Sequence, residues 1–329
     1  MAIKNIVVCC DGTGNEYGKN NTNVVETYAL AMKTASQLAY YDPGVGTGGW
    51  AYNEESGVLR ALSDQGTGAG LQKNVNDAYR YLMEVYEGPE TSRIFLFGFS
   101  RGAFTVRSLA GMLHKVGLLE QKAGNHLEYA AKIYNQRRNA RVAAGFKATF
   151  SRPAPVHFIG VWDTVESLVL NEGKRWANAR LNPEIAFAYH ALAIDEKRKD
   201  FQPCLWDERN RRPGQSLEQV WFAGVHSDVG GYHPERGLAN ISLHWMLGKA
   251  ADAGMEVNQR RLGGKRYRPD PNGPSQESYT GFWRFRGRHV RKIPEGCRIH
   301  RSVWDRAANP SNDYSPRNLP GRDLVETVE

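Results

Sequence analysis

The chain has 329 residues, of which 41% are hydrophobic and 24% are charged. This composition is typical of globular proteins and excludes the fibrous and disordered classes. No stretch approaches the roughly 18 to 20 consecutive apolar residues that a membrane-spanning helix requires. The formal net charge is +8.

The beginning of the chain indicates synthesis in the cytoplasm. Its apolar run is too short for the core of a signal peptide, and Asp11 ends it. We therefore expect neither a signal peptide nor a transmembrane segment, while secretion by a route without a cleavable signal stays open. The four cysteines form no C-x-x-C pair, so we expect them to be reduced, with no metal site and no cofactor.

Predicted strands and helices alternate along the chain, which favours a mainly parallel sheet with helices on both faces. We expect one α/β-hydrolase domain over residues 1–329, in which residues 260–329 are a basic, loop-rich C-terminal elaboration. A polar, lid-like region is expected over 166–182. The predicted strands cover residues 3–10, 38–41, 94–97, 156–162 and 219–225, and the predicted helices cover 22–36, 71–86, 103–116, 125–144, 183–198 and 241–253.

The most informative motif is G-F-S-R-G at residues 98–102, between an apolar strand and a predicted helix. In this context G-x-S-x-G is a nucleophile elbow, a tight turn that lifts the serine hydroxyl above the sheet edge. The tightness of the turn explains the two glycines. Ser100 is therefore the candidate nucleophile, and the backbone N–H of Arg101 is a candidate oxyanion donor at the helix N-terminus. The alternative is a glycine-rich turn with an incidental serine.

Two more strand ends supply the partners that a serine nucleophile needs. The carboxyl ends of parallel strands line one edge of a sheet, so Ser100, Asp163 and His226 are expected to meet there. Their order along the chain is that of α/β hydrolases. His226 would act as general base and then acid, and Asp163 would hold the imidazole tautomer.

Other residues compete for these roles. Asp228 is the rival acid, although it is better placed to order the following glycine turn, and His300 is the rival base. Asp163 could instead cap the segment after it. Asp11 is expected to accept hydrogen bonds from loop N–H groups near the site.

The second oxyanion donor is expected in the loop after the first strand, from the N–H of Gly12 or Thr13. The glycine-rich runs at 44–49 and 66–70 lack the G-K-[ST] ending of a phosphate-binding loop, so phosphate binding there is not expected.

The positive charge is concentrated late in the chain, because residues 260–329 contain 15 Lys and Arg against 8 Asp and Glu. Such a segment could meet an anionic membrane surface, nucleic acid or an acidic partner, or it could be a solvated face. The aromatic residues interleaved with it are Tyr267, Tyr279, Phe282, Trp283 and Phe285.

Several motifs together resemble one known group. They are C-D-G-T-G-N at 10–15, G-F-S-R-G-A at 98–103, V-W-D-T-V at 161–165, A-L-A-I-D-E at 191–196, G-V-H-S-D-V-G-G at 224–231 and W-D-R at 304–306. The chain is similar to the catalytic domain of the α/β hydrolases that include the first family of type VI secretion lipase effectors. The resemblance implies a triad of Ser100, Asp163 and His226, and phospholipase activity. The chain departs from the pattern at Tyr232, where a third glycine is expected.

We therefore expect a serine hydrolase that cleaves carboxylic esters through an acyl-enzyme, as a lipase or phospholipase on membrane lipids. An esterase for small soluble esters is the alternative enzyme. The alternative outside enzymes is a hydrolase fold that binds nucleic acid or another anion, although no nucleic acid partner is expected. The oligomeric state is not predicted.

Overall fold

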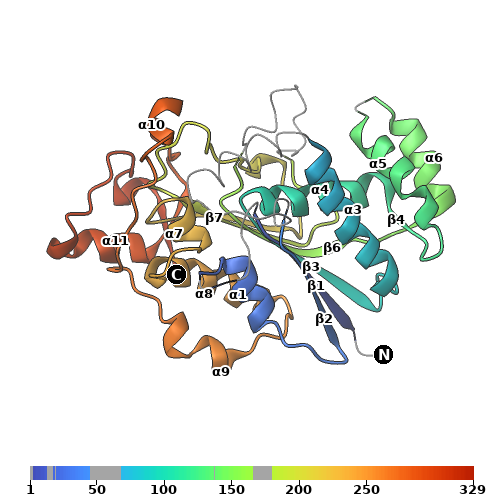
Figure 1. Cartoon of the computed structure of the whole chain (residues 1–329), viewed down its shortest axis with the longest axis horizontal. Helices are drawn as coiled ribbons and strands as arrows, with labels where there is room; N and C mark the ends of the chain where they lie inside the picture. Colours follow the sequence, from blue (N-terminus) through green and yellow to red (C-terminus); the bar gives the residue numbers. More distant parts are fainter. Residues whose placement is uncertain (1–2, 13–17, 19, 45–67, 137, 166–179) are drawn as a thin grey trace.

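The computed structural model describes residues 3–12, 18, 20–44, 68–136, 138–165 and 180–329. It confirms the predicted α/β class, because the described strands form an eight-stranded sheet in the order β10-β9-β8-β7-β6-β3-β1-β2, with parallel pairing throughout (Figure 1). The strands of this sheet are β1 (Lys4–Cys10), β2 (Gln37–Asp42), β3 (Ser92–Phe99), β6 (Val156–Trp162), β7 (Phe187–Ala193), β8 (Ser216–Phe222), β9 (Arg298–His300) and β10 (Glu326–Val328). A small antiparallel pair consists of β4 (Leu118–Leu119) and β5 (Ser151–Arg152).

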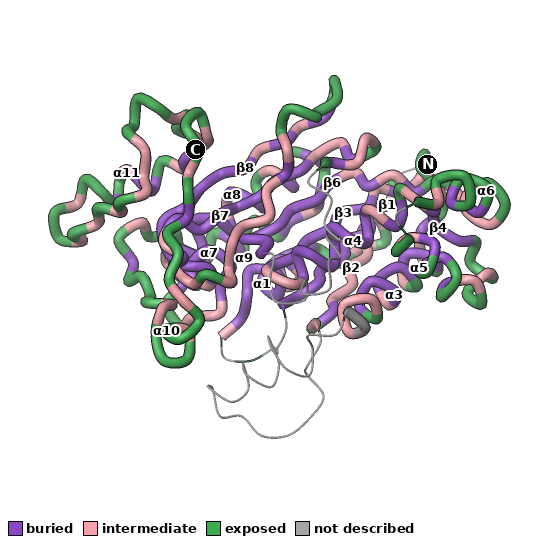
Figure 2. The backbone as a smooth tube through the Cα atoms, turned by 90° about the horizontal axis from the view of Figure 1, so that it is seen from above, coloured by how far each residue is buried: buried purple, intermediate pink, exposed green. Residues whose placement is uncertain are grey.

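Helices cover both faces of the sheet (Figure 1). The strands are mostly buried (Figure 2), and apolar side chains pack between the sheet and the helices. One core cluster joins the sheet to the helices α3 to α6, and the other joins it mainly to α1 and α8. Alternate residues of β1 belong to the two clusters, because successive side chains of a strand point to opposite faces. The helices are α1 (Asn23–Leu30), α3 (Gly68–Val85), α4 (Arg101–Val116), α5 (Leu127–Asn135), α6 (Ala140–Phe150), α7 (His226–Gly230), α8 (Gly237–Asp252), α9 (Gln259–Leu262), α10 (Trp283–Arg286) and α11 (Arg301–Ala308).

The strand order reverses at β1. The chain passes from β1 outward to β2 and then returns to place β3 on the other side of β1. In open parallel sheets, ligands bind outside the carboxyl ends of the strands at such a reversal. The elbow after β3 and the Asp11 loop after β1 both lie at this point.

The predicted helix over 183–198 is wrong, because this segment forms the central strand β7. Strand β7 lies between β6 and β8, and core clusters pack on both of its faces, so every residue from Ala188 to Ala193 is buried. A strand buried on both faces has no alternation of apolar and polar residues. The run F-A-Y-H-A-L-A, rich in alanine, was therefore indistinguishable from a buried helix by periodicity.

Two predicted helices have different bounds. Helix α1 ends at Leu30 rather than near residue 36. Ala31 adopts an extended backbone conformation and forms a β-bridge with Val257, and the N–H of the next residue donates to the carbonyl of residue 256. The predicted helix over 125–144 is divided into α5 and α6. The Asn139 side chain donates to the Ile133 carbonyl at 2.8 Å and thereby satisfies the end of α5.

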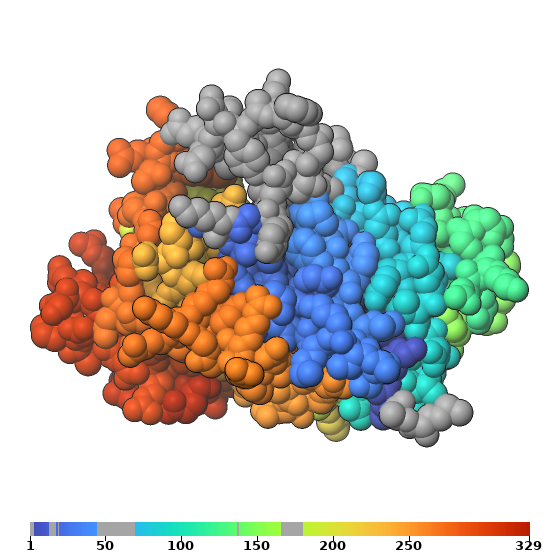
Figure 3. Space-filling model, turned by 60° about the horizontal axis from the view of Figure 1, so that its bottom comes forward, coloured from blue at the N-terminus to red at the C-terminus, as the bar shows by residue number. Residues whose placement is uncertain are grey.

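The C-terminal segment contains more regular structure than its composition predicts. It adds β9 and β10 to the sheet edge, and α11 covers a third core cluster around Trp221 and Ile299. In Figure 3 the residues from about 250 onward form one side of the molecule and lie directly against the N-terminal segment. The Glu26 carboxylate joins the two, since it accepts hydrogen bonds from Arg266 and Tyr267.

Asn23 links helix α1 to the region that follows β8. Its fully buried side chain donates to the carbonyls of Val229 and Ala239 and accepts from Arg236 Nη2 at 2.7 Å. These contacts connect α1 with both α7 and α8, and therefore fix the short helix that begins at His226.

Replacing Asn23 with alanine removes the hydrogen-bond partner of the Val229 and Ala239 carbonyls and of Arg236 Nη2, all of which are buried. We expect Asn23→Ala to lower the free energy of unfolding by about 2 to 3 kcal/mol, measured by urea denaturation. The matched control is Asn135→Ala, which removes an exposed hydrogen bond to Gln72 and should change the stability by less than about 0.5 kcal/mol. Equal effects of the two substitutions would contradict this role of Asn23.

Candidate active site

Ser100 lies in the turn between β3 and α4, in a backbone conformation that few residues other than glycine adopt. Its φ is 56° and its ψ is −118°. A side chain on Gly98 would lie 2.5 Å from the Gly102 carbonyl, and one on Gly102 would lie 2.0 Å from the Cys10 carbonyl. The two glycines are therefore required by close backbone approach, within the turn and against the end of β1. This is the geometry of a nucleophile elbow.

Asp163 and His226 are in direct contact. Asp163 follows β6 with a φ of 40°, a second strained position beside the elbow. Its Oδ2 lies 2.6 Å from His226 Nδ1, and both side chains are buried. The contact leaves His226 Nε2 as the ring nitrogen available to another group.

Backbone pairing brings Ser100 to the same place. The Ser100 N–H donates to the Trp162 carbonyl, directly before Asp163, at 3.0 Å. The ring of Phe99, the residue before the serine, lies 4.5 Å from the His226 ring between centroids. In the part of the chain that the structure describes, the Ser100 hydroxyl forms no hydrogen bond with His226. The three residues thus share one region, in which the aspartate and the histidine are paired.

His226 differs in one respect from its expected placement. Strand β8 ends at Phe222, four residues earlier, and His226 is the first residue of helix α7. Its backbone N–H points toward Glu196, with 3.3 Å between the nitrogen and Oε2. The buried Glu196 carboxylate also accepts from Arg198 and from the Ser278 hydroxyl, so it fixes the start of α7.

Arg291 is the most important site residue that the sequence did not reveal. Its side chain is fully buried and donates from Nη1 to Asp163 Oδ1 at 2.7 Å and from Nη2 to Oδ2 at 2.9 Å. The same two nitrogens donate to the carbonyls of Ala193 and Phe201. The Ala193 N–H completes the set with a 3.0 Å bond to Asp163 Oδ1.

These contacts determine the charge states. Burial alone would raise the pKa of Asp163, but Arg291 and then His226 outweigh it and hold this pKa well below its usual range. Burial lowers the pKa of His226 more than the Asp163 charge raises it, so the imidazole is neutral at pH 7. Burial opposes ionisation of Glu196 as well, yet Arg198 brings its pKa down to about 2.

The rival residues have other contacts. Asp228 accepts from the N–H groups of Val225 and Gln276 and from the Ser275 hydroxyl, and its carboxylate therefore anchors α7 to the C-terminal segment. His300 stacks on Phe222 and caps α11, where burial lowers its pKa to about 4. Asp11 accepts from the Gly12 N–H, as expected of a loop-ordering residue, and also from Thr22 and Tyr41.

The structure describes two of the three candidate oxyanion donors. The Arg101 N–H is at the first position of α4, where helix geometry provides no intrahelical acceptor. The Gly12 N–H donates to Asp11 Oδ1 at 2.7 Å and is therefore engaged. Thr13 lies outside the described residues, as do most of the glycine-rich loop after residue 44 and of the lid-like region.

Comparison with known proteins identifies the family. The model of the type VI secretion phospholipase effector Tle1-like catalytic domain matches residues 4–249. The chain belongs to this family. The resemblance noted in the sequence is thereby confirmed.

Individual relatives are more distant. An uncharacterised protein of Saccharomyces cerevisiae is 31% identical over 222 residues, which cover 60% of this chain and 32% of the relative. The crystal structure of an uncharacterised protein from Pseudomonas aeruginosa has a TM-score of 0.50 and 19% identity, over 82% of this chain and 49% of that one. The Tle1 effector bound to the VgrG spike has a TM-score of 0.37 and 17% identity, over 70% and 52%. The chain thus spans about a third of the curated relative and about half of each solved structure.

Tyr232 occupies the position at which a third glycine was expected, and its backbone conformation is one that glycine adopts readily. Tyr232 has a φ of 103°, which favours glycine. Its N–H donates to the Asn21 carbonyl, and a side chain on the preceding Gly231 would lie 2.8 Å from the Asn23 nitrogen. The turn after α7 therefore packs closely against the start of α1.

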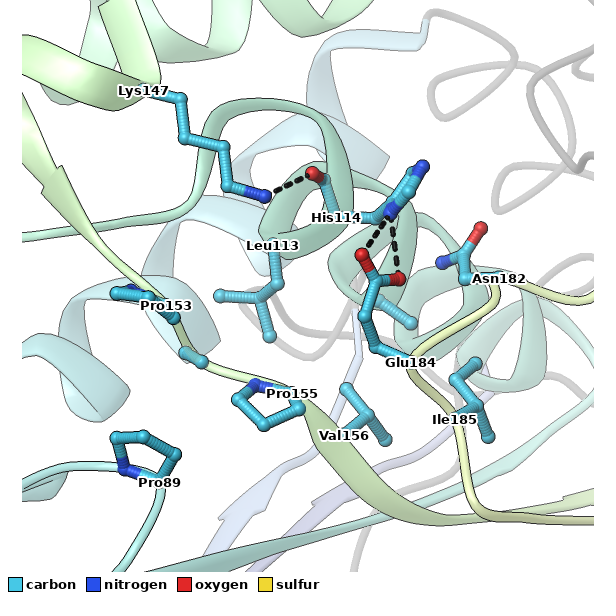
Figure 4. A pocket seen from close by; sticks show the side chains of 12 residues that line it. Pro89, Leu113, His114, Lys147, Pro153, Pro155, Val156, Asn182, Glu184 and Ile185 are labelled. Carbon is cyan, nitrogen blue, oxygen red and sulfur yellow. Dashed lines mark hydrogen bonds and ion pairs between the residues drawn. The ribbon is translucent and has the colours of Figure 1, made fainter. Parts of the chain in front are cut away.

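A pocket of about 180 Å³ lies between the end of α4 and the start of β6, and none of Ser100, Asp163 and His226 lines it (Figure 4). It is lined by Val156 at the start of β6 and by the end of α4, where His114 contacts Glu184 at 2.7 Å. Its position at the amino ends of the strands is opposite to the edge where parallel sheets bind ligands. We do not associate it with the chemistry.

Within the described ranges, no group of three His, Cys, Asp or Glu side chains is placed to hold a metal ion. In the same residues no helix is both long and apolar enough to cross a membrane. Cys9 and Cys10 are buried in β1, and burial raises the pKa of both thiols, which disfavours a thiolate nucleophile.

The charge arrangement predicts the titration of His226. We expect its imidazole to titrate below the usual value of about 6.5, because its burial outweighs the charge of Asp163. Asp163→Asn should lower this pKa further, since it removes the group that stabilises the imidazolium. Two-dimensional NMR of the ring protons against pH measures both values, with His226→Gln to assign the resonance. A pKa above 7 in the wild type would contradict this electrostatic account.

Proposed function

We propose that the chain is a serine hydrolase that cleaves carboxylic esters of membrane phospholipids through an acyl-enzyme on Ser100. The observation that carries the proposal is the elbow itself, with a strained serine held beside a buried Asp163–His226 pair. Membership of a family of phospholipase effector catalytic domains supports the substrate class.

The residues have distinct roles in this mechanism. His226 Nε2 removes the proton from the Ser100 hydroxyl as the oxygen attacks the ester carbonyl, and Asp163 stabilises the resulting imidazolium. The Arg101 N–H faces the oxyanion of the tetrahedral intermediate. The imidazolium then donates its proton to the leaving alcohol. In the second half, His226 activates a water molecule, which releases the fatty acid and regenerates the serine.

Covalent labelling tests this mechanism directly. We expect a fluorophosphonate to label the wild type at one site, and Ser100→Ala to abolish both labelling and ester hydrolysis, because loss of a triad nucleophile costs about 10⁴-fold or more. Ser108→Ala, which changes a buried serine of the same helix, is the matched control and should keep both. Retained hydrolysis in Ser100→Ala would refute the assignment.

The helix α10 supports a lipid surface as the location of the substrate. The aromatic tip formed by α10 and the residues next to it consists of Phe282, Trp283 and Phe285 with the exposed Arg284 and Arg288. Phe285 is 89% exposed and Phe282 is 38% exposed. Exposed aromatic rings among arginines suit the interface of an anionic membrane, where the rings enter the acyl boundary and the guanidinium groups meet phosphates.

The tip is connected to the site by ring contacts. Trp283 contacts Phe201 at 5.2 Å between centroids, and Phe201 contacts the His226 ring at 5.0 Å. The Arg198 guanidinium lies over the Phe201 ring at 3.5 Å. A lipid headgroup region that meets α10 would therefore lie close to the nucleophile.

Part of the basic character of the C-terminal segment is not available to a membrane. Five of its arginines have carboxylate partners within the chain, and Arg291 is one of them. The proposed membrane contact therefore depends on α10 rather than on the net charge of the segment. The five pairs are Arg266–Glu26, Arg286–Asp200, Arg291–Asp163, Arg298–Glu326 and Arg301–Glu329.

A substitution in the tip separates a phospholipase from an esterase of soluble substrates. We expect Phe285→Ser to reduce fatty-acid release from anionic phospholipid vesicles by about 10- to 100-fold, since a buried phenylalanine contributes about 1.5 to 3 kcal/mol. Hydrolysis of a short-chain nitrophenyl ester in solution should not change. Val142→Ser, at a 51% exposed residue of α6, is the control and should leave both activities intact. An unchanged vesicle rate in Phe285→Ser would favour the soluble ester as substrate.

A further inference from the structure

We infer that Arg291 is a positioning residue for the hydrolysis: it holds the Asp163 carboxylate in the orientation that presents Oδ2 to His226. This inference rests on the proposed function. It assigns a role to a residue outside the segment that matches the catalytic-domain family, which ends at residue 249.

The geometry is that of a fixed fork. The guanidinium donates to both oxygens of Asp163, at 2.7 and 2.9 Å, and the two contacts together define the plane of the carboxylate. The Ala193 N–H restrains Oδ1 further. With Oδ1 restrained by two donors, Oδ2 is left to face His226 Nδ1 at 2.6 Å.

Arg291 is itself held from both sides. The carbonyls of Ala193 and Phe201 accept from its two terminal nitrogens at 2.7 and 2.6 Å. The Asn318 side chain donates to the Arg291 carbonyl at 3.1 Å and so fixes the backbone. Lysine cannot reproduce this arrangement, because one ammonium has no planar fork.

The C-terminal segment also supports the other two carboxylates around α7. Ser278 donates to Glu196, and Ser275 donates to Asp228. All three buried acids near His226 therefore have partners beyond residue 249. The segment that the family model does not cover therefore supplies hydrogen-bond partners to all three carboxylates.

Arg291 also affects the general base. The charged groups around His226 are Asp163, Glu196, Arg198 and Arg291, with Asp228 on the same helix. Arg198 is the positive charge that opposes the imidazolium directly, whereas Arg291 is paired with Asp163 at 2.7 Å. Without Arg291, the negative charge of Asp163 acts on His226 without that counter-charge. The pKa of His226 should then rise, so that activity begins to fall at a higher pH than in the wild type.

Steady-state kinetics on a soluble nitrophenyl ester test the inference in the full chain. We expect Arg291→Met to lower kcat by about 100-fold, the cost of a small misplacement of a catalytic group, with little change in KM. The acid limb of its pH–rate profile should move upward. In an Asp163→Asn background the same substitution should cause no further loss, because Arg291 acts through Asp163.

Two further variants keep the test decisive if Arg291→Met does not fold. Arg291→Lys keeps the charge but not the fork, and should fold with kcat at least about tenfold lower. Arg306→Met removes another buried arginine of the same segment, which donates to the carbonyls of Pro271 and Gly273, and should keep the wild-type kcat.

The outcomes separate the inference from the proposed function. A wild-type kcat in folded Arg291→Lys, or an equal loss caused by Arg291→Met with and without Asp163, would overturn the positioning role. A wild type that neither hydrolyses the ester nor reacts with a fluorophosphonate would overturn the proposed function instead.

Discussion

The site depends on a carboxylate that is completely withdrawn from water. A buried charge is tolerated only where hydrogen bonds and an opposite charge replace the lost hydration. Asp163 obtains them from His226, Arg291 and the Ala193 N–H, which belong to α7, the C-terminal segment and β7. Each of these elements must be in place before the carboxylate can be buried as an anion. The assembly of the site is therefore coupled to the folding of segments from most of the chain.

This coupling explains why the C-terminal segment cannot be regarded as a separate addition. Its β9 and β10 extend the sheet, while its loop between α9 and β9 carries Arg291 and the serines that bind Glu196 and Asp228. Five of its arginines pair with carboxylates of the chain. A net charge of +8 suggested a surface for anions, and the structure accounts for a part of it as internal pairing.

The sequence predicted the features that are governed by local rules. The glycines at 98 and 102 are needed by a tight turn, so the elbow could be located, and the apolar runs of β1, β3 and β6 were recognised. Strand β7 was missed because its burial on both faces removes the periodic signal on which the assignment depended. Arg291 could not be found in this way. The segment contains many arginines, and the local sequence does not distinguish the buried Arg291 from the exposed ones. Its partner Asp163 is 128 residues away along the chain.

The four charges around His226 suggest how a buried base can work near neutral pH. Asp163 and Glu196 stabilise an imidazolium, burial and the Arg198 charge disfavour it, and Arg291 pairs with Asp163. A general base works best when its pKa is close to the working pH. Because burial outweighs the hydrogen bond and charge of Asp163, His226 is neutral at rest. Its contact with Asp163 still lets it hold a proton briefly, as the proposed transfer from the serine to the leaving alcohol requires.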